Sequence, residues 1–561
     1  MRILLLLLLS PLFTFSQDQL FYNARIFTGN YDQPFAEAIA IRNGKVLAVG
    51  SLKDVEKKLG KAALRTDLKG QTLLPGMVDS HIHAIKGGKT LTKANLKDVP
   101  TDVPSIAAYA QEAIRKQEGM TGDVLDMYGL NISTWSHLDE LSKAFNSGEL
   151  ARHPVILRGS DGHTVFANQA MLRKAGVDKA YLQTLSGDMR SYYATLPDGQ
   201  PSGFVTEDGI KILHAAVPNV VDYALAAKKT MDYANGYGLT AWLEASATTT
   251  ATTESEILDA YHGLIRANAL SAHVVATIVA KADSSPEKQI DTVLAIRKKY
   301  ERPNLKVAGF KVFADGVLEY PTQTAALSSN YTGTNHKGVF MFEPGNFARF
   351  ATAADKAGML VHVHAIGDRA VTETLNGFER VRKQNGNTRI PHSITHMQLV
   401  VPTDFSRFRQ LNVLTSQQLL WAFGDVTTID IVQPYIAQEL YKWQYPAKSL
   451  LDAGAVVAGA SDWPVSSANP FEAIYHAETR KGPKGVLDSS QCMPRMAMFY
   501  GYTIEAAKVL LLEKEIGSLE PGKWADMVLV DRDVFSVDAE SMRDTRVLWT
   551  MFEGKVVWRR Q

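Results

Sequence analysis

The middle of this chain alternates short β-branched runs with stretches of helical pattern, and this alternation limits the folds open to it. A β–α alternation is typical of a parallel sheet flanked by helices. Eight strands are the number that closes a barrel. We therefore predict an α/β protein built around a (β/α)8 barrel of the TIM type. The expected strands are Met77–His83, Thr240–Ala245, His273–Val279, Val307–Phe313, Met359–His364, Pro391–His396, Val413–Gln418 and Val456–Asp462.

The two ends of the chain have a different pattern. Residues 17–75 and 511–561 contain short β-prone runs separated by turns, of which Asn43-Gly44 is a strong hairpin signal. Neither end is large enough to bury a core alone. We expect them to pair into one small β-sandwich domain built from both chain ends, beside a barrel domain at residues 76–510.

A long segment separates the first two expected strands. It holds roughly 140 residues, far more than a βα loop needs. We therefore predict a large insertion after the first barrel strand, at about residues 90–220, that emerges over the mouth of the barrel.

The first sixteen residues have the pattern of a secretory signal peptide. Arg2 gives a positive start, an apolar run follows over residues 3–9, and small residues at Thr14 and Ser16 mark a cleavage site before Gln17. The run is too short to span a bilayer. An uncleaved anchor or a buried N-terminal strand is the alternative. We expect export to the periplasm or the extracellular space, and no integral membrane segment after cleavage.

Charge and cysteine content exclude several classes of function. The chain has 60 Lys and Arg against 59 Asp and Glu, a net charge of +1, so no basic surface for nucleic acid is expected. Cys492 is the single cysteine, which rules out an intrachain disulfide and a thiolate metal cluster. The expected partner is a small-molecule substrate, and a homodimer is a candidate assembly.

Histidine and aspartate residues end several of the expected strands. His81 and His83 are two apart, so both imidazoles face the same side of their strand and suit one divalent ion. Three further strands end at His364, His396 and Asp462. Any one of these histidines alone could be an ordinary buried or surface residue. Because polar residues at the carboxyl ends of barrel strands converge on the mouth, the set together predicts a metal site.

Lys311 lies among apolar neighbours on the fourth expected strand. A buried ammonium is costly unless it is paired or neutralised. One solution is reaction with CO2 to give a carbamate that bridges two metal ions. The other is an ion pair, for which Asp315 is the nearest carboxylate in sequence. The residues themselves leave both open.

Four motifs together resemble the amidohydrolase superfamily, and within it the YtcJ-like branch, amidohydrolase family 3. They are residues 74–83, Lys311 with 314–316, residues 363–370 and residues 459–464. The resemblance implies a barrel flanked by a β-sandwich, a divalent cofactor expected to be zinc as one ion or two, and a carboxylated Lys311. The ligands that it implies are His81, His83, Lys311, His364, His396 and Asp462.

Two further matches to this family lie in the insertion, at residues 158–163 with Asn168 and at residues 203–207. His163 is expected to bind the substrate or stabilise a tetrahedral oxyanion, and a structural turn in the inserted lobe is its alternative. No specific role follows for Glu207. The substrate-binding candidates are Asp161, Asn168, Glu207 and Asp315.

The family implies hydrolysis of carbon–nitrogen bonds in amides, formamides and related compounds. A divalent ion lowers the pKa of bound water from about 15.7 toward 7, so that hydroxide can attack the carbonyl. Asp462 is expected to accept the water proton and deliver it to the leaving nitrogen. The alternatives are a non-hydrolytic metal-dependent barrel enzyme, such as an isomerase or decarboxylase, and an inactive exported binding protein.

Two loops expected at the mouth depart from the family pattern. The segment 317–322 replaces a loop that often contains Ser, Gly or Arg, and the strand ending at 415–418 lacks the usual Gln-Pro. These departures bear on the substrate. Aromatic residues near the mouth point either to an apolar substrate group or to packing. They are Trp135, Trp421, Phe423 and Trp463.

Overall fold

The computed structural model describes residues 17–60, 62–96, 99–159, 164–206, 209–218, 222–320, 323–386 and 390–561. The chain divides into two compact units. One comprises Met1–Ala84 with Met231–Gln561, and the other comprises Ile85–Thr230. The expected signal peptide at residues 1–16 lies outside the described residues.

The larger unit contains a sheet of eight parallel strands in the order β20-β19-β18-β17-β16-β15-β14-β6. All eight strands expected from the sequence are present, most within one or two residues of the predicted ends, so the prediction of a barrel is confirmed. The strands are β6 (Met77–Ile82), β14 (Leu239–Thr249), β15 (His273–Val279), β16 (Leu305–Phe313), β17 (Leu360–Ala365), β18 (His392–His396), β19 (Val413–Gln417) and β20 (Val457–Gly459).

Hydrogen bonds just beyond the strand ends join the last strand to the first. The Asp462 backbone N–H donates to the His81 carbonyl at 2.8 Å, and the His83 N–H donates to the Trp463 carbonyl at 2.9 Å. The Ser80 hydroxyl donates to the Gly459 carbonyl at 2.9 Å. The sheet is therefore nearly closed, and this junction of β20 with β6 is called the seam below.

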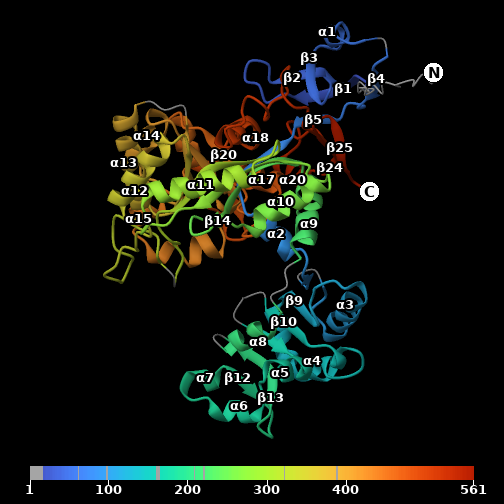
Figure 1. Ribbon diagram of the computed structural model, residues 1–561, viewed down its shortest axis with the longest axis vertical. Helices are drawn as coiled ribbons and strands as arrows, with labels where there is room; N and C mark the ends of the chain where they lie inside the picture. Colours follow the sequence, from blue (N-terminus) through green and yellow to red (C-terminus); the bar gives the residue numbers. More distant parts are fainter. Residues whose placement is uncertain are drawn as a thin grey trace, which may run out of the picture. The chain divides into compact units, whose positions relative to one another are not determined.

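The barrel strands are buried because helices cover their outer face (Figure 1). A glycine in the left-handed region stands just before two of these strands: Gly238 (φ 79°) directly precedes β14, and Gly358 (φ 72°) lies two residues before β17, where each ends the preceding helix. Among the described residues, no helix combines the length and apolarity needed to cross a membrane. The helices between and after the strands are α9 (Tyr223–Gly236), α10 (Glu256–Arg266), α11 (Pro286–Tyr300), α12 (Pro344–Lys356), α13 (Asp368–Asn385), α14 (Phe405–Gln410), α15 (Gln438–Tyr441), α16 (Ala447–Asp452), α17 (Pro470–Thr479), α18 (Arg495–Tyr500), α19 (Ala506–Val509) and α20 (Ala539–Arg543).

The two chain ends share one further sheet in this unit (Figure 1). Strand β5 from the N-terminal segment pairs antiparallel with β23 from the C-terminal segment, with Leu74 opposite Val528. Ile26, Ile39, Met527 and other buried residues from both ends form its core. The sheet comprises β1 (Gln19–Phe27), β2 (Phe35–Arg42), β3 (Lys45–Gly50), β4 (Leu64–Asp67), β5 (Thr72–Pro75), β23 (Met527–Val530), β24 (Val547–Phe552) and β25 (Lys555–Arg559), with α1 (Leu52–Glu56) after β3.

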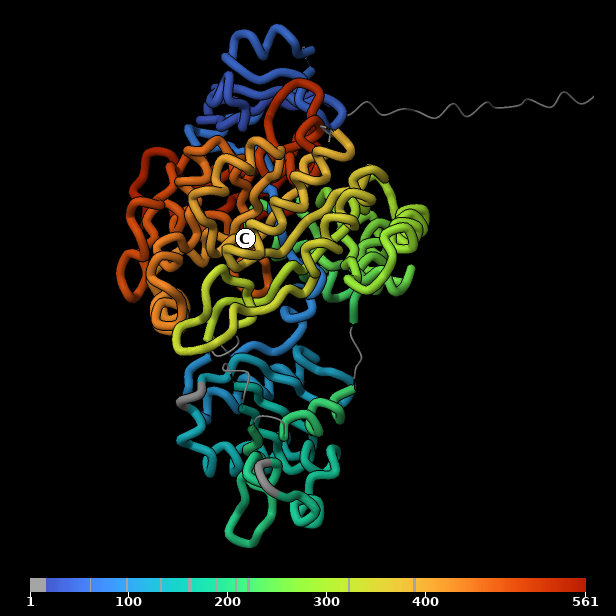
Figure 2. The backbone as a smooth tube through the Cα atoms, turned by 90° about the vertical axis from the view of Figure 1, so that its left-hand side faces the viewer, coloured from blue at the N-terminus to red at the C-terminus, as the bar shows by residue number. Residues whose placement is uncertain are grey.

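The smaller unit, Ile85–Thr230, lies between β6 and β14 in the sequence and is called the inserted unit. Its chain folds on itself around its own sheet, in the order β12-β13-β11-β10-β9-β7 with β8 beside β9 (Figure 2). Its strands are β7 (Ala94–Asn95), β8 (Met120–Thr121), β9 (Val124–Leu130), β10 (Val155–Gly159), β11 (Thr164–Ala167), β12 (Tyr193–Thr195) and β13 (Pro201–Thr206). Its helices are α2 (Ala84–Thr90), α3 (Val103–Lys116), α4 (Leu138–Phe145), α5 (Gln169–Ala175), α6 (Lys179–Thr184), α7 (Gly187–Ser191) and α8 (Ile210–Ala216).

Candidate metal centre

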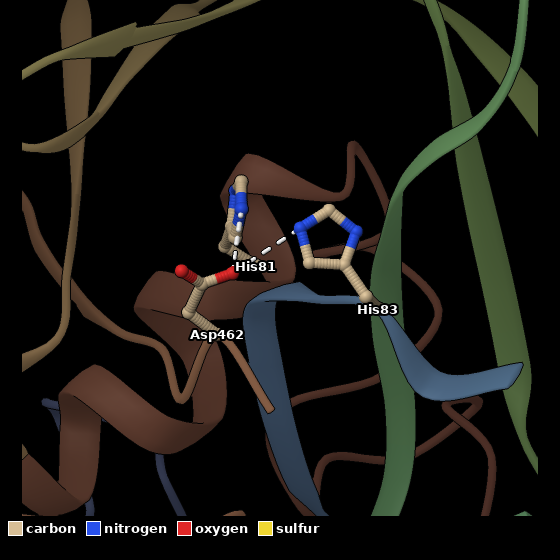
Figure 3. Close-up of side chains that lie close together, drawn as sticks. All are labelled: His81, His83 and Asp462. Carbon is tan, nitrogen blue, oxygen red and sulfur yellow. Dashed lines mark ion pairs between the residues drawn. The ribbon is translucent and has the colours of Figure 1, made fainter. Parts of the chain in front are cut away.

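Three of the predicted metal ligands meet at the seam. His81 is the penultimate residue of β6, His83 directly follows that strand, and Asp462 lies three residues after β20. The Asp462 Oδ1 atom lies 3.2 Å from the His81 Nε2 atom and 3.3 Å from the His83 Nε2 atom. Figure 3 shows both imidazoles directed at this carboxylate. One ligand atom from each of the three lies within 4.8 Å of the others, so a single ion could contact all of them.

The other predicted ligands come from the next strands and line the same cavity. They are Lys311 on β16, His364 on β17 and His396 at the end of β18. The ring centroids of His364 and His396 are 4.6 Å apart, and those of His396 and His81 are 5.0 Å apart. The barrel therefore brings together six side chains that are separated by up to 381 positions in the sequence (462 minus 81).

Each of the four imidazoles has one nitrogen held by another group. His83 Nδ1 lies 2.6 Å from the Ala245 carbonyl oxygen, and His364 Nε2 lies 2.9 Å from the Gly316 carbonyl oxygen. His396 Nδ1 lies 3.0 Å from the Gln418 Oε1 atom. Such contacts fix the tautomer and the ring orientation, leaving the second nitrogen for a metal ion.

The fourth imidazole is oriented by a residue that sequence analysis missed. His81 Nδ1 lies 2.6 Å from His362 Nε2, and His362 Nδ1 in turn lies 2.7 Å from the Ser393 hydroxyl. His362 is fully buried on β17. Its spacing from His364 repeats the His-x-His pattern of the first strand, and that pattern was the available signal.

The site holds His81, His364 and His396 neutral and Asp462 ionised. Burial and the nearby Lys311 ammonium lower the pKa of His364 to about 4, and they move the pKa of His81 well below its usual value. Burial alone would raise the pKa of Asp462, but a hydrogen bond from His83 and the charges of neighbouring groups outweigh it and hold that pKa below its usual value. Neutral imidazole and ionised carboxylate are the forms that bind a metal ion.

Lys311 has no hydrogen-bond partner among the described residues, although its side chain is only 1% exposed. Burial lowers the pKa of this amine to about 7. The alternative of a Lys311–Asp315 ion pair is not found. The Asp315 carboxylate instead accepts hydrogen bonds from the backbone N–H groups of Ala326, Ile366 and Gly367, at 2.9 to 3.0 Å.

Two site residues have unusual backbone conformations. His396 has φ 76° and Asp462 has φ 54°, both in the left-handed region that non-glycine residues rarely adopt. Conformations of this kind cost about 1 kcal/mol or more and cluster at functional sites. At the seam, the Asp79 Oδ1 atom accepts hydrogen bonds from the backbone N–H groups of His81 (3.0 Å) and Ser461 (3.1 Å), which helps to hold the strand ends in place.

Of the candidate residues in the insertion, only Asn168 is described. Asp161, His163 and Glu207 lie outside the described residues. Asn168 is fully buried and caps helix α5. Its Oδ1 accepts from the backbone N–H groups of Val155 and Met171 at 3.0 and 2.9 Å. Its Nδ2 donates to three backbone carbonyls, those of Phe145, Leu150 and His153.

The six predicted metal ligands line a cavity of about 570 Å³. Trp421 and Phe423 line it, and the Trp421 ring stacks parallel to His396 with centroids 5.8 Å apart. Trp463 instead packs, with 4% exposure, against Tyr233. Trp135 belongs to the inserted unit, and of the three such aromatic residues in the larger unit, Trp421 and Phe423 are the two that line the cavity.

The residues present fit a divalent metal ion. Four imidazoles and a carboxylate are the nitrogen and oxygen donors that zinc and similar ions bind. A buried amine with no partner completes the set. Removing several polar groups from water without partners would otherwise be costly, so the donor chemistry itself indicates a cation.

Comparison with known proteins agrees with this geometry. A family model described as "Amidohydrolase family" matches residues 66–558. Protein LONG AFTER FAR-RED 3 of Arabidopsis thaliana is 29% identical, over 96% of this chain and 91% of that protein. The putative amidohydrolase YtcJ of Bacillus subtilis is 26% identical, over 93% and 96%. The N-substituted formamide deformylase of Arthrobacter pascens is 24% identical, over 97% and 99%.

A solved structure has the same fold. A crystal structure of an uncharacterized metal-dependent hydrolase from Pyrococcus horikoshii superposes with a TM-score of 0.69 at 24% identity, covering 93% of this chain and 99% of that one. The resemblance inferred from the motifs is confirmed. Because the family model spans most of the sequence, the chain belongs to the amidohydrolase family, a family of metal-dependent hydrolases that act on carbon–nitrogen bonds.

Proposed function

We propose that this enzyme hydrolyses the carbon–nitrogen bond of a small amide- or formamide-like substrate at the centre formed by His81, His83 and Asp462. One observation carries the proposal: Asp462 Oδ1 lies 3.2 and 3.3 Å from two imidazole nitrogens inside a cavity large enough for a small molecule. The names of two relatives, a putative amidohydrolase and a formamide deformylase, support the same bond type.

The chain's own residues have separable tasks in this reaction. His81, His83, His364, His396, Lys311 and Asp462 would hold zinc, as one ion or two. A bound ion supplies Lewis acidity, which lowers the pKa of a water molecule and polarises a carbonyl oxygen. The Asp462 carboxylate, ionised at neutral pH, accepts the proton of the attacking water and returns it to the departing nitrogen. That return matters because an unprotonated amide nitrogen is a very poor leaving group.

We further propose that Lys311 is carboxylated. Its pKa of about 7 leaves much of the amine unprotonated at neutral pH, and the unprotonated amine is the form that reacts with CO2. The reaction joins the Nζ atom to carbon and releases one proton. The product is a carbamate whose oxygens can bind metal. Activity should then fall when the metal-free protein is reconstituted in CO2-free buffer and should return with bicarbonate.

The proposal is tested with purified protein by metal analysis followed by a screen of N-formyl and N-acyl compounds. Hydrolysis in H2¹⁸O must place solvent oxygen in the acid product. An isomerase or a decarboxylase would not do so, and a binding protein would turn over no compound. Loss of activity with chelator and recovery with zinc is expected. Full activity in metal-free protein would contradict the proposal.

We also propose that residues 1–16 are a signal peptide that directs export of the protein and is then removed. N-terminal sequencing of the protein from the producing cells tests it: a new terminus at Gln17 is expected, and an intact Met1 would contradict it.

A further inference from the structure

Two carboxylates that have no part in the metal centre line the same cavity. They are Glu319 and Asp425. Among the described residues lining this cavity, no arginine occurs, and Lys311 is the one lysine. The cavity is a ligand site on independent grounds, because the buried Lys311 amine lines it without a partner. Outside the metal centre, the charge that a substrate meets there is therefore negative.

The two carboxylates belong to loops that follow β16 and β19. These loops are held to one another: the Tyr320 N–H donates to the Ile431 carbonyl at 2.9 Å, and the Tyr320 and Tyr435 rings stack with centroids 4.2 Å apart and planes 7° apart. Leu318, beside Glu319, is fully buried in the same contact region. Glu319 and Asp425 thus lie on loops that are packed against one another. They lie in or just after the two segments where the sequence departs from the family pattern.

Neither carboxylate is neutralised by a described cation. The Glu319 side chain forms no hydrogen bond or ion pair within the described part of the chain. Asp425 uses Oδ1 to accept from the Thr428 N–H (2.9 Å) and hydroxyl (3.1 Å). Lys484 pairs with Asp430 instead, at 2.8 Å. His476 lies near Asp425, but burial lowers its pKa to about 4, so it is uncharged at neutral pH.

The charges of both carboxylates raise the pKa of one buried side chain, that of Tyr445. Tyr445 lines the cavity, and its pKa is raised well above its usual value by burial and then by the charges of Glu319 and Asp425. A cation in contact with either carboxylate inside this cavity would be attracted more strongly than it would be in water. The exposed faces of Trp421 and Phe423 add a surface that also favours a cation.

We propose that the substrate carries a positive charge, as an ammonium or guanidinium group, and that Glu319 and Asp425 bind it while the scissile bond lies at the metal-binding side chains. Glu319 and Asp425 are then determinants of specificity. This inference rests on the proposed function, because it names the substrate class of that site. It is independent of the identity of the metal ion.

The test compares substrates that differ only in charge. N-formyl and N-acetyl derivatives of α,ω-diaminoalkanes, with one free ammonium group, are set against N-formyl and N-acetyl alkylamines of equal length. ω-Aminoacyl amides are set against simple acyl amides, so that a cation on either side of the bond is sampled. The cationic member of the better pair is expected to have a kcat/KM at least about tenfold higher.

Variants then assign the preference to residues. Glu319→Gln and Asp425→Asn are each expected to reduce the cationic-to-neutral ratio of kcat/KM about tenfold, mainly through KM, and Asn at 425 keeps the helix-capping acceptor. Glu319→Lys should reverse the preference toward substrates with a carboxylate. The matched control is Asp430→Asn, which removes an acid from the same loop at a residue that does not line the cavity. Its ratio is expected to equal that of the unaltered protein.

The outcomes separate this inference from the proposed function. Equal or better turnover of the neutral compounds overturns the inference and leaves amide hydrolysis in place. Turnover of no amide at all overturns the proposed function. In that case, calorimetric titration of the zinc-loaded protein with pentylammonium and with pentanol still tests the inference. It stands if the ammonium binds at least about tenfold tighter and Glu319→Gln removes the difference, and it fails if the two bind alike.

Discussion

The barrel and the inserted unit treat their buried polar side chains differently. In the barrel, Lys311 Nζ and Asp79 Oδ2 are buried without a hydrogen-bond partner among the described residues. No described residue of Ile85–Thr230 has such an atom. There Asn168 uses both ends of its side chain on five backbone groups. At the metal centre the unused bonding capacity of Lys311 leaves it open to a ligand, whereas the saturated bonding of Asn168 supports the fold of the inserted unit. The comparison predicts which substitutions change the reaction and which change stability.

The largest effect is expected from Asp462→Asn. The amide keeps the size and one oxygen donor but loses the proton-accepting charge, so kcat should fall roughly 10³- to 10⁴-fold. Metal content, measured by inductively coupled plasma mass spectrometry, should stay nearly unchanged. His81→Ala is the companion variant, for which metal content should fall as well. Near-normal kcat in Asp462→Asn would refute the proton-transfer role.

Asn168→Ala should act on stability instead. It leaves two backbone N–H groups and three carbonyls without their partner, which we expect to cost about 4 kcal/mol in the inserted unit. Urea unfolding followed by hydrogen exchange of residues 155–171 measures this cost. Asn168→Asp, which keeps the acceptor and loses the donor, should give an intermediate value. A raised KM with unchanged stability would instead support the predicted substrate-binding role of Asn168.

Metal removal should lower the stability of the barrel and leave the stability of the inserted unit unchanged. An ion held at 100 to 1,000 times its Kd stabilises the folded state by about 3 to 4 kcal/mol, and its removal should withdraw that amount from the barrel alone. Differential scanning calorimetry with and without chelator, read beside hydrogen exchange of each unit, provides the measurement. An equal loss of protection in Ile85–Thr230 would break the comparison.

The smallest effect concerns pH in the metal-free protein. Burial, followed by the charge of Lys311, lowers the pKa of His364 to about 4 from 6.5. As the pH falls, His364 of the unfolded chain therefore binds a proton at a higher pH than His364 of the folded chain. The stability that the neutral imidazole provides is present above pH 6.5 and is lost as the pH falls toward 4. Between pH 7 and pH 5.5 we expect a loss of about 1 kcal/mol. His364→Gln should flatten this part of the profile, and an unchanged slope would contradict the assignment.

The barrel was predictable because its signals are local. Each strand is a short buried run, five of the eight carry a predicted ligand at or near the carboxyl end, and β15 begins and ends where the sequence predicted, at His273 and Val279. His81, His83, His364, His396 and Asp462 could be chosen because strand ends converge in any barrel. That these residues would meet could therefore be predicted without knowing the course of the loops.

What escaped prediction depends on tertiary contacts. The role of His362 follows from its 2.6 Å contact with His81, and no property of its own sequence neighbourhood gives that distance. Glu319 and Asp425 stand in irregular loops, whose course depends on packing such as the Tyr320–Tyr435 stack. Asp315 could be placed at a strand end, but its three backbone donors come from two different segments.

The seam has a consequence for the order in which this chain acquires its properties. His81 and His83 are made early, whereas their nearest carboxylate arrives with residue 462, after β20 has completed the sheet. A growing or truncated chain that stops before this strand lacks the carboxylate that joins the two imidazoles at the seam and to which the proposed proton transfer is assigned. The proposed reaction should therefore require the chain to be complete through residue 462.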